Sequence, residues 1–222
     1  MNKHLSDLVY KVLERRKLTI VSFAWSKKNK AFDLACRVKK ETDMTLTLSE
    51  ASQIYSITRD TAKVPGDLAE VGVYTGASAK LVCEAKGNRI LHLFDTFQGL
   101  PELSDADTKW QFHKNQYSCS LNDVKSYLHD YMNVYFYEGF FPQTATPVMN
   151  TKFSLVHLDV DLYESTKNGL NFFYPRMNPG GIIISHDYVN SKGVHTAFDE
   201  FFKDKPEPVI ELAERQCIII KL

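Results

Sequence analysis

The sequence lacks the features that would tie it to nucleic acid, to a membrane or to an oxidising compartment. Its 222 residues carry 27 basic and 27 acidic side chains, so no net charge attracts nucleic acid or an anionic membrane surface. The four cysteines form no CxxC pair, which disfavours a disulfide framework or a zinc–thiolate site and favours a reduced, cytoplasmic protein. No apolar run is long enough to cross a membrane, and the stretch at 18–25 lacks the cleavage site of a signal peptide.

Glycine and proline are absent from the chain before Pro65. Because both residues interrupt helices, their absence leaves room for long helical stretches. The pattern predicts helices over roughly 3–16, 28–41 and 47–62. Thr47 or Ser49 is expected to cap the third helix. We therefore expect an N-terminal helical cap segment over 1–62, followed by a second domain over 63–222.

Short apolar runs alternate with helical stretches in that second domain. The predicted strands cover 68–74, 90–95, 133–138, 153–160, 181–185, 208–212 and 216–222. Strands that alternate with helices form βαβ units around a parallel sheet. Only 213–215 separates the last two runs, which is too short for a helical crossover, so they are expected to pair as an antiparallel hairpin. The prediction is an α/β protein with a Rossmann-like, mostly parallel seven-stranded sheet.

A glycine turn follows the first strand in the sequence EVGVYTG, where Gly72 and Gly76 permit tight geometry and close approach to a ligand. The spacing E-x-G-x-x-x-G differs from that of pyrophosphate-binding turns, so it favours S-adenosylmethionine and disfavours an NAD-dependent oxidoreductase. Glu70 is expected to orient the amino group of this cofactor, and Ser78 to bond its carboxylate. Asp95 ends the second strand, where an acid accepts hydrogen bonds from ribose hydroxyls. Ordinary turn glycines and a helix-capping acid are the alternative explanation.

Three further residues are candidates for the adenine end of the same site. Phe97 follows the second strand in a loop, and Glu138 and Gly139 end the third strand. The base of a nucleoside cofactor lies on that side of such sheets. Core packing explains Phe97 equally well.

A second group of polar residues ends the fourth and fifth strands. Asp159 and Asp161 follow one of them, and His186 and Asp187 follow the other. They are expected to meet, because the carboxyl ends of parallel strands share one rim of the sheet. Two carboxylates suit Mg²⁺, which would lower the pKa of an acceptor hydroxyl. His186 is interpreted as a general base or a nitrogen ligand to the metal, Asp161 as a helix cap, and His157 as a core residue.

The chain resembles the macrocin O-methyltransferase (TylF-like) family in four stretches: VPGDLAEVGVYTGASA, LFDTFQGLPE, LDVDLYEST and YPRMNPGGIIISHDY. The resemblance covers about residues 60–205 and implies a Rossmann-like class I methyltransferase fold, similar to that of catechol-type enzymes. It also implies methylation of hydroxyls, often on deoxysugars of natural products, with S-adenosylmethionine as donor and Mg²⁺ held by aspartates. The resemblance assigns cofactor-binding positions to Glu70, Gly72 and Asp95, and the metal and catalytic positions to Asp159 and Asp187.

One departure from that family concerns the metal. Related sequences carry two consecutive acids where this chain has His186-Asp187. The metal site is therefore weaker, uses the histidine or is absent, and the sequence leaves these three readings open. Asp159, Asp187 and His186 are the candidates both for catalysis and for metal binding.

The predicted function is O-methyl transfer to a hydroxyl of a small acceptor, such as a sugar or another natural product. Acceptor contacts are expected from the N-terminal helices and the loop 100–120, which carries Trp110, Phe112, His113 and Tyr117. Pairing of two copies through the N-terminal helices is a further expectation, whereas no nucleic acid or membrane partner is expected. The alternative is a non-catalytic module of the same fold that binds the cofactor or another nucleoside.

Overall fold

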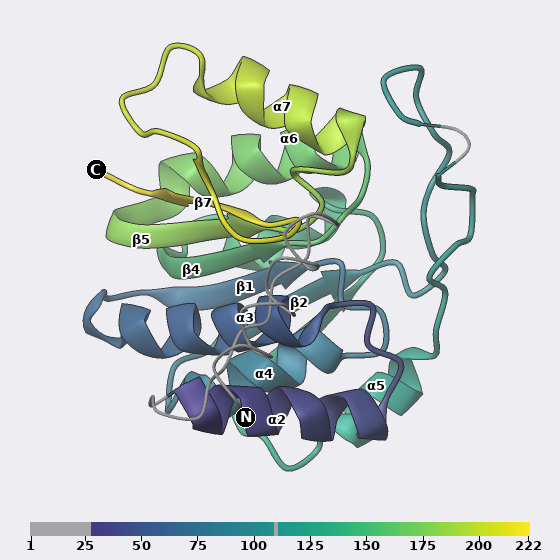
Figure 1. Ribbon diagram of the computed structural model, residues 1–222, viewed down its shortest axis with the longest axis vertical. Coiled ribbons are helices and arrows are strands. Elements are labelled where there is room, and N and C mark those ends of the chain that lie inside the picture. Colours follow the sequence, from purple (N-terminus) through teal and green to yellow (C-terminus); the bar gives the residue numbers. More distant parts are fainter. Residues whose placement is uncertain (1–27, 109–110) are drawn as a thin grey trace, which may run out of the picture.

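A mixed β-sheet runs through the part of the chain that the computed structural model describes, residues 28–108 and 111–222 (Figure 1). Its seven strands lie in the order β3-β2-β1-β4-β5-β7-β6. The strands are β1 (Asp67–Val71), β2 (Leu91–Asp95), β3 (Val134–Glu138), β4 (Phe153–Leu158), β5 (Met177–Ser185), β6 (Ile210–Glu211) and β7 (Cys217–Ile220). The pairs among β1 to β5 are parallel, whereas β7 runs antiparallel to β5 and β6. The predicted fold class and the C-terminal hairpin are thus confirmed.

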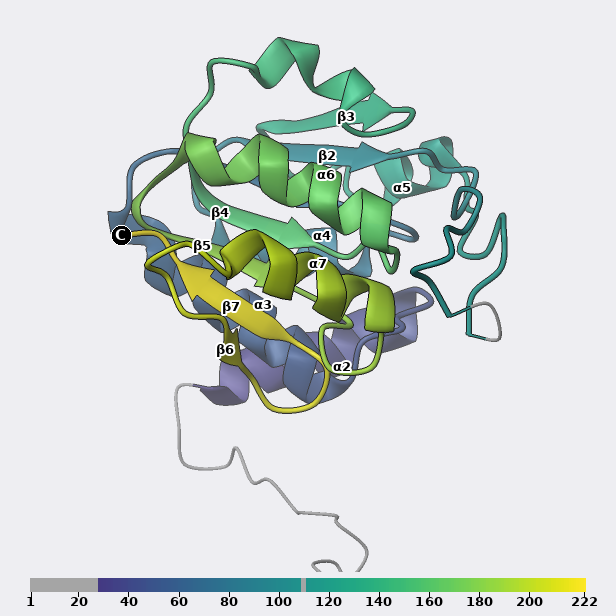
Figure 2. The same cartoon turned by 90° about the horizontal axis from the view of Figure 1, so that it is seen from above.

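Helices cover the two faces of this sheet in two layers (Figures 1 and 2). One face carries α2 (Lys28–Glu41), α3 (Leu48–Asp60), α4 (Ala77–Ala85) and α5 (Leu121–Tyr127). The other face carries α6 (Tyr163–Phe173) and α7 (Lys192–Phe202). The short 3-10 helices are η1 (Thr61–Lys63), η2 (Gln143–Val148) and η3 (Tyr174–Arg176). None of the helices in the described ranges is long and apolar enough to span a membrane.

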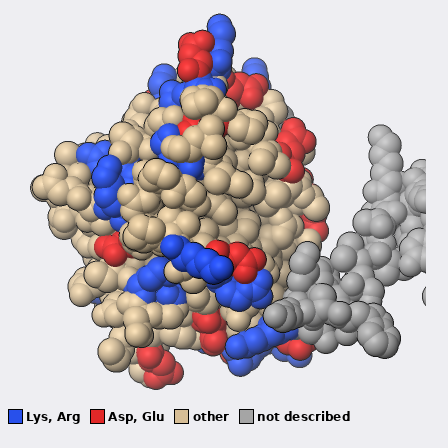
Figure 3. Space-filling view, turned by 90° about the vertical axis from the view of Figure 1, so that its left-hand side faces the viewer, with Lys and Arg blue, Asp and Glu red and all other residues tan. Residues whose placement is uncertain are grey.

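Neighbouring residues of the inner strands point into opposite halves of the core, because side chains alternate along a strand. Leu68 of β1 packs with the α2–α5 layer, and Ala69 packs with the α6–α7 layer. Every residue of β4 is buried, which explains its nearly continuous apolar sequence. Figure 3 shows the face where the parallel strands begin, on which basic and acidic side chains are interspersed.

The predicted helices at 28–41 and 47–62 are confirmed as α2 and α3, whereas the one predicted at 3–16 lies outside the described residues. Thr47, not Ser49, caps α3 through a capping box. The Thr47 hydroxyl accepts a hydrogen bond from Glu50 N (3.2 Å), and Glu50 Oε2 accepts one from Thr47 N (2.9 Å). Both helices share one core cluster with the sheet, and the domain division at residue 62 stays a prediction.

Gly72 brings the carboxyl ends of β1 and β4 together. Its φ is +86°, and a Cβ atom at this position would lie 1.8 Å from the carbonyl oxygen of Asp159. A side chain would therefore force the two strand ends apart. The sequence predicts glycine here for approach to a ligand, and the structure adds approach to the neighbouring strand as a second reason.

Gly72→Ala should therefore destabilise the protein by more than the cost of placing an alanine in a left-handed backbone conformation. We expect the free energy of unfolding to fall by about 3 kcal/mol or more, measured by urea denaturation. Gly87→Ala is the matched control, because Gly87 also has positive φ (+61°) but no atom within 4 Å of the added Cβ. It should cost only about 1–2 kcal/mol. Equal losses in the two variants would contradict the close-approach explanation.

Candidate active site

One cavity lies at the carboxyl ends of the parallel strands, where open α/β sheets bind ligands. It has a volume of about 260 Å³ and is bounded by the turn after β1, the ends of the strands beside it, the α2–α3 linker and the β6–β7 hairpin. The predicted site residues that line it are Gly72, Ser78, Asp95, Gly139, Asp159, His186 and Asp187. The predicted site residues outside its wall are Glu70, Gly76, Phe97 and Glu138. The two sequence motifs therefore meet in one cavity.

Asp95 holds the glycine turn in shape. Its Oδ2 atom accepts hydrogen bonds from Val73 N (2.6 Å) and Tyr74 N (2.9 Å), and its Oδ1 atom accepts one from Phe97 N (2.7 Å). A carboxylate offers about four acceptor positions, so these backbone bonds leave one for a ligand hydroxyl. The turn and the acid are thus one unit that faces the cavity.

Glu70 lies behind the cavity wall. Its side chain is fully buried, and Oε1 is 3.0 Å from His157 Nδ1. Within the part of the chain that the structure describes, Glu70 Oε2 and His157 Nε2 have no hydrogen-bond partner. Burial raises the pKa of Glu70 and outweighs the opposing effect of His157. His157 is the core histidine that the sequence predicts, whereas direct contact between Glu70 and a ligand stays a prediction.

Three other predicted site residues lie outside the cavity wall. Gly76 precedes α4 in a left-handed conformation, and a Cβ there would lie 3.1 Å from Val124 on α5. Phe97 is buried in the core, as its alternative interpretation proposed. Glu138 is exposed at the end of the edge strand β3. Their roles toward a cofactor therefore lack support from the shape of the cavity.

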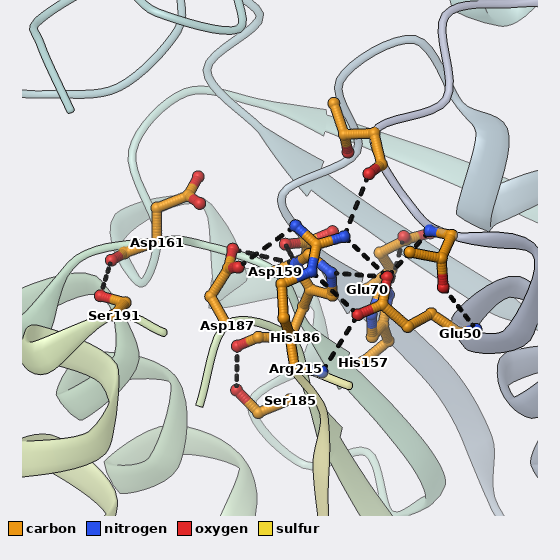
Figure 4. A network of polar contacts seen from close by, with 12 residues as sticks. Glu50, Glu70, His157, Asp159, Asp161, Ser185, His186, Asp187, Ser191 and Arg215 are labelled. Carbon is orange, nitrogen blue, oxygen red and sulfur yellow. Dashed lines mark hydrogen bonds and ion pairs between the residues drawn. The ribbon is translucent and has the colours of Figure 1, made fainter. Parts of the chain in front are cut away.

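Asp159, His186 and Asp187 form a polar cluster opposite the glycine turn (Figure 4). His186 Nδ1 lies 2.9 Å from Asp187 Oδ2 and 3.1 Å from Asp159 Oδ1. His186 Nε2 lies 3.4 Å from Glu50 Oε2 as an ion pair and forms no hydrogen bond within the described residues. Both ring nitrogens thus face carboxylates of the protein, and neither is directed at a substrate hydroxyl.

Burial by itself lowers the pKa of His186, but Asp159, Asp187 and Glu50 outweigh it and raise the pKa well above its usual range. The ring is therefore protonated when the carboxylates are its only neighbours. A protonated imidazole has no lone pair, so this arrangement does not support the predicted general-base role. The nitrogen-ligand role requires that a metal ion replace the proton on Nδ1.

Glu50 is a site residue that the sequence reasoning missed. It lies on α3, is fully buried, and binds Arg215 through Nη2–Oε2 (2.7 Å) and Nε–Oε1 (3.0 Å) contacts. Burial raises the pKa of Glu50, but His186 and Arg215 outweigh it and hold the pKa below its usual range. The available signal was an acid on the apolar face of a predicted helix, four residues before Ile54.

Asp161 does not cap α6, which corrects its sequence interpretation. The cap position is Leu162, and the N–H group of Tyr163 instead donates to Asp107 Oδ1 (2.8 Å) from the loop after β2. Asp161 itself lines the cavity, and Figure 4 draws no contact between its carboxylate and His186. Burial, then Asp159 and Asp187, raise the pKa of Asp161. It is therefore an additional candidate for proton transfer.

The aromatic residues of the loop after β2 divide into two groups. Phe112 and Tyr117 line the cavity, whereas His113 is exposed and does not. Trp110 lies outside the described residues. Tyr117 packs edge-on against Tyr74 of the glycine turn, with 5.5 Å between ring centroids. The loop and the turn thus share one wall, as the predicted acceptor site requires.

The donor end of the cavity fits S-adenosylmethionine in its chemistry. Asp95 keeps an acceptor position for a hydroxyl, and Ser78 presents its hydroxyl from the first turn of α4, where a carboxylate is stabilised. Phe140 and Phe141 line the wall beside Gly139 and supply apolar surface for a base. The opposite end fits a divalent ion that binds nitrogen as well as oxygen ligands. Three potential ligand atoms, one each from Asp159, His186 and Asp187, lie there within 4.8 Å of one another.

Comparison with known proteins identifies relatives in both sequence and structure. The family profile described as Macrocin-O-methyltransferase (TylF) matches residues 47–215. The chain is 33% identical over 140 residues to 8-demethyl-8-(2,3-dimethoxy-alpha-L-rhamnosyl)-tetracenomycin-C 4'-O-methyltransferase of Streptomyces olivaceus, which covers 56% of this chain and 54% of that protein. It is 29% identical over 153 residues to demethyldecarbamoylnovobiocin O-methyltransferase of Streptomyces niveus, which covers 62% and 58%. The matches thus span little more than half of these relatives' lengths.

Solved structures share the fold at lower sequence identity. The O-methyltransferase NovP superposes with a TM-score of 0.70 at 23% identity and covers 99% of both chains. The calicheamicin methyltransferase CalS11 superposes with a TM-score of 0.63 at 18% identity and covers 92% of this chain and 95% of its own. These likenesses confirm the predicted α/β architecture over the whole domain.

Glu50→Gln should reveal how strongly the buried charge cluster stabilises the fold. Loss of the Glu50 charge removes one buried carboxylate from the partners of Arg215 and His186, so we expect the free energy of unfolding to fall by about 2–3 kcal/mol at pH 7. Because the pKa of Glu50 is lower in the folded than in the unfolded chain, its contribution is present above the unfolded value of 4.5 and is lost as the pH falls. The gap between wild type and variant should therefore narrow on acidification, measured by urea denaturation at several pH values.

Asp60→Asn is the matched control for this prediction. Asp60 lies on the same helix and forms an exposed ion pair with Arg59 (2.8 Å). Its loss should change the free energy of unfolding by less than about 1 kcal/mol. Similar losses in both variants, or a gap for Glu50→Gln that does not depend on pH, would contradict the assigned role.

Proposed function

Because this chain belongs to the macrocin O-methyltransferase (TylF) family, we propose that it transfers a methyl group from S-adenosylmethionine to a hydroxyl of a small acceptor. The acceptor class is a sugar or a glycosylated natural product. The names of the relatives support this class, since one is an O-methyltransferase for a rhamnosyl-tetracenomycin. The names of the solved relatives point the same way, since CalS11 is called a TDP-rhamnose 3'-O-methyltransferase.

A single observation carries this proposal: one cavity joins the glycine turn to the carboxylate cluster. Gly72 and Asp95 line one end, and Asp159, Asp161 and Asp187 line the other. Methyl transfer needs an oxygen placed in line behind the methyl carbon, and the sulfonium leaving group needs no assistance. Positioning of two molecules in one cavity is therefore the main task of the protein.

The donor site is formed by the turn, by Ser78 and by Asp95. Ser78 and the start of α4 bind the carboxylate of the cofactor, and the free acceptor position of Asp95 binds a ribose hydroxyl. Gly139 leaves room for the base beside Phe140 and Phe141. Glu70 acts from behind the wall, because its side chain is buried and its Oε2 atom has no hydrogen bond within the described residues.

Asp161 is the residue assigned to accept the proton of the acceptor hydroxyl. It lines the cavity, and its carboxylate is not used to cap α6, whose cap position is Leu162. Its backbone adopts a left-handed conformation (φ 59°), which Asp tolerates better than most residues. Asp159, Asp187 and His186 would hold a metal ion, and such an ion would supply Lewis acidity that lowers the pKa of an acceptor hydroxyl.

Calorimetry with S-adenosylhomocysteine tests the donor assignment. We expect micromolar or tighter binding of S-adenosylhomocysteine and at least about 100-fold weaker binding of NAD, because the turn lacks the pyrophosphate geometry. Asp95→Asn should weaken S-adenosylhomocysteine binding about tenfold or more, through loss of a charge-assisted bond and of the turn's support. Preferential binding of NAD would overturn the proposal.

Asp161→Asn tests the assigned proton acceptor. We expect kcat to fall by about 10²- to 10⁴-fold, while the Kd for S-adenosylhomocysteine changes less than about twofold. Radiolabelled S-adenosylmethionine with a panel of rhamnosylated acceptors supplies the assay. Asp199→Asn, on the exposed face of α7, is the control and should leave kcat unchanged. Binding of S-adenosylhomocysteine without transfer to any acceptor would favour the non-catalytic module, and unchanged kcat in Asp161→Asn would refute the base role.

A further inference from the structure

His186 adds a nitrogen donor to the cluster, because its ring nitrogen Nδ1 lies beside the carboxylates of both Asp159 and Asp187. We propose that Asp159, His186 and Asp187 form a mixed nitrogen–oxygen site that prefers a first-row transition ion such as Co²⁺ or Mn²⁺ over Mg²⁺. Glu50 positions His186 for this ligation from outside the site. The inference rests on the proposed function in one respect, since that function makes the end of the cavity that holds the ion the acceptor end.

The two separations from His186 Nδ1 match those between ligands of a metal centre, and all three ligand atoms lie within 4.8 Å of one another. His186 Nδ1 lies 2.9 Å from Asp187 Oδ2 and 3.1 Å from Asp159 Oδ1. Neighbouring ligands of an octahedral ion with bonds of about 2.1 Å lie about 3.0 Å apart. An ion could therefore replace the shared proton without rearrangement of the backbone.

The surroundings of the ring supply the second element of a histidine metal site. A metal-bound histidine commonly donates its other ring N–H to a carboxylate, which fixes the tautomer and the ring orientation. Here Nε2 is buried and lacks a hydrogen-bond partner, and its nearest acceptor is Glu50 Oε2 at 3.4 Å. Glu50 is itself held by Arg215 and by the Thr47 N–H group. The carboxylate is thus fixed in place to receive this bond.

The donor set disfavours Mg²⁺ relative to softer ions. Mg²⁺ binds oxygen ligands and gives up its water reluctantly, so an imidazole in place of a carboxylate removes both a charge and a preferred donor. First-row ions accept imidazole, and their affinity for mixed sites rises from Mn²⁺ toward Co²⁺ and beyond. The two remaining carboxylates are partly neutralised by Arg215, whose Nη1 lies 3.7 Å from Asp187 Oδ1. The imidazole therefore lowers the affinity of the site for Mg²⁺ more than its affinity for a first-row transition ion.

Calorimetric titration of the full chain with CoCl₂ and MgCl₂ tests this preference. We expect Co²⁺ to bind at least about 100-fold more tightly than Mg²⁺ in the wild type. His186→Asp should reduce that ratio to about tenfold or less, because it restores an all-oxygen donor set. Pulsed EPR of the Mn²⁺-loaded wild type should show coupling to ¹⁴N that His186→Asp abolishes. His195→Asp, which changes an exposed histidine of α7, is the control and should alter neither result.

Glu50→Gln tests the positioning role. It should weaken Co²⁺ binding about 10- to 100-fold, while circular dichroism and S-adenosylhomocysteine affinity, measured in EDTA, stay as in the wild type. Equal affinity of the wild type for Co²⁺ and Mg²⁺, absence of ¹⁴N coupling, or no binding of either ion would overturn the inference. The EDTA measurement separates the two proposals: loss of S-adenosylhomocysteine binding counts against the donor site alone, whereas the metal titrations count for or against the mixed site alone.

Discussion

The site depends on the contact between Gly72 and the backbone of Asp159. Here the ends of β1 and β4 approach more closely than any side chain on Gly72 would allow. Because of this contact, the glycine turn and the carboxylate of Asp159 belong to one wall of the cavity. Asp95 then holds the turn from the next strand through its bonds to Val73 N and Tyr74 N. The distance between the glycine turn and the carboxylate cluster is thus set by strand pairing and not by mobile side chains.

A buried charge cluster connects this wall to both ends of the described chain. Glu50 comes from α3, and Arg215 comes from the hairpin that closes the sheet, and both meet His186 or Asp187 at the rim. Buried charges are costly unless each is paired, so these groups stabilise the fold only as a complete set. A change at one member therefore affects the acceptor site and the stability of the fold together.

The sheet could be predicted from sequence because each strand carries its own signal. The apolar run of β4, the short link before β7 and the residues of α2 are local patterns that require no knowledge of the remainder. Asp107 shows where this reasoning stops, since it caps α6 from a loop 56 residues earlier. Glu70 was identified from its motif, yet its burial depends on His157 of a neighbouring strand. Contacts between distant segments leave no local pattern, so the partners of charged residues could not be inferred.

The charge of the cavity wall restricts the acceptor further. Five aspartates, at positions 43, 95, 159, 161 and 187, line the cavity, whereas its cationic side chains within the described residues are His186 and Arg215. Arg215 is already bound to Glu50, so neither cation is free to pair with an anionic group of a ligand. Carboxylates in this excess repel an anion and accept hydrogen bonds from hydroxyls. The electrostatics of the wall therefore favour a cationic donor and a neutral, hydroxyl-rich portion of the acceptor at the point of transfer.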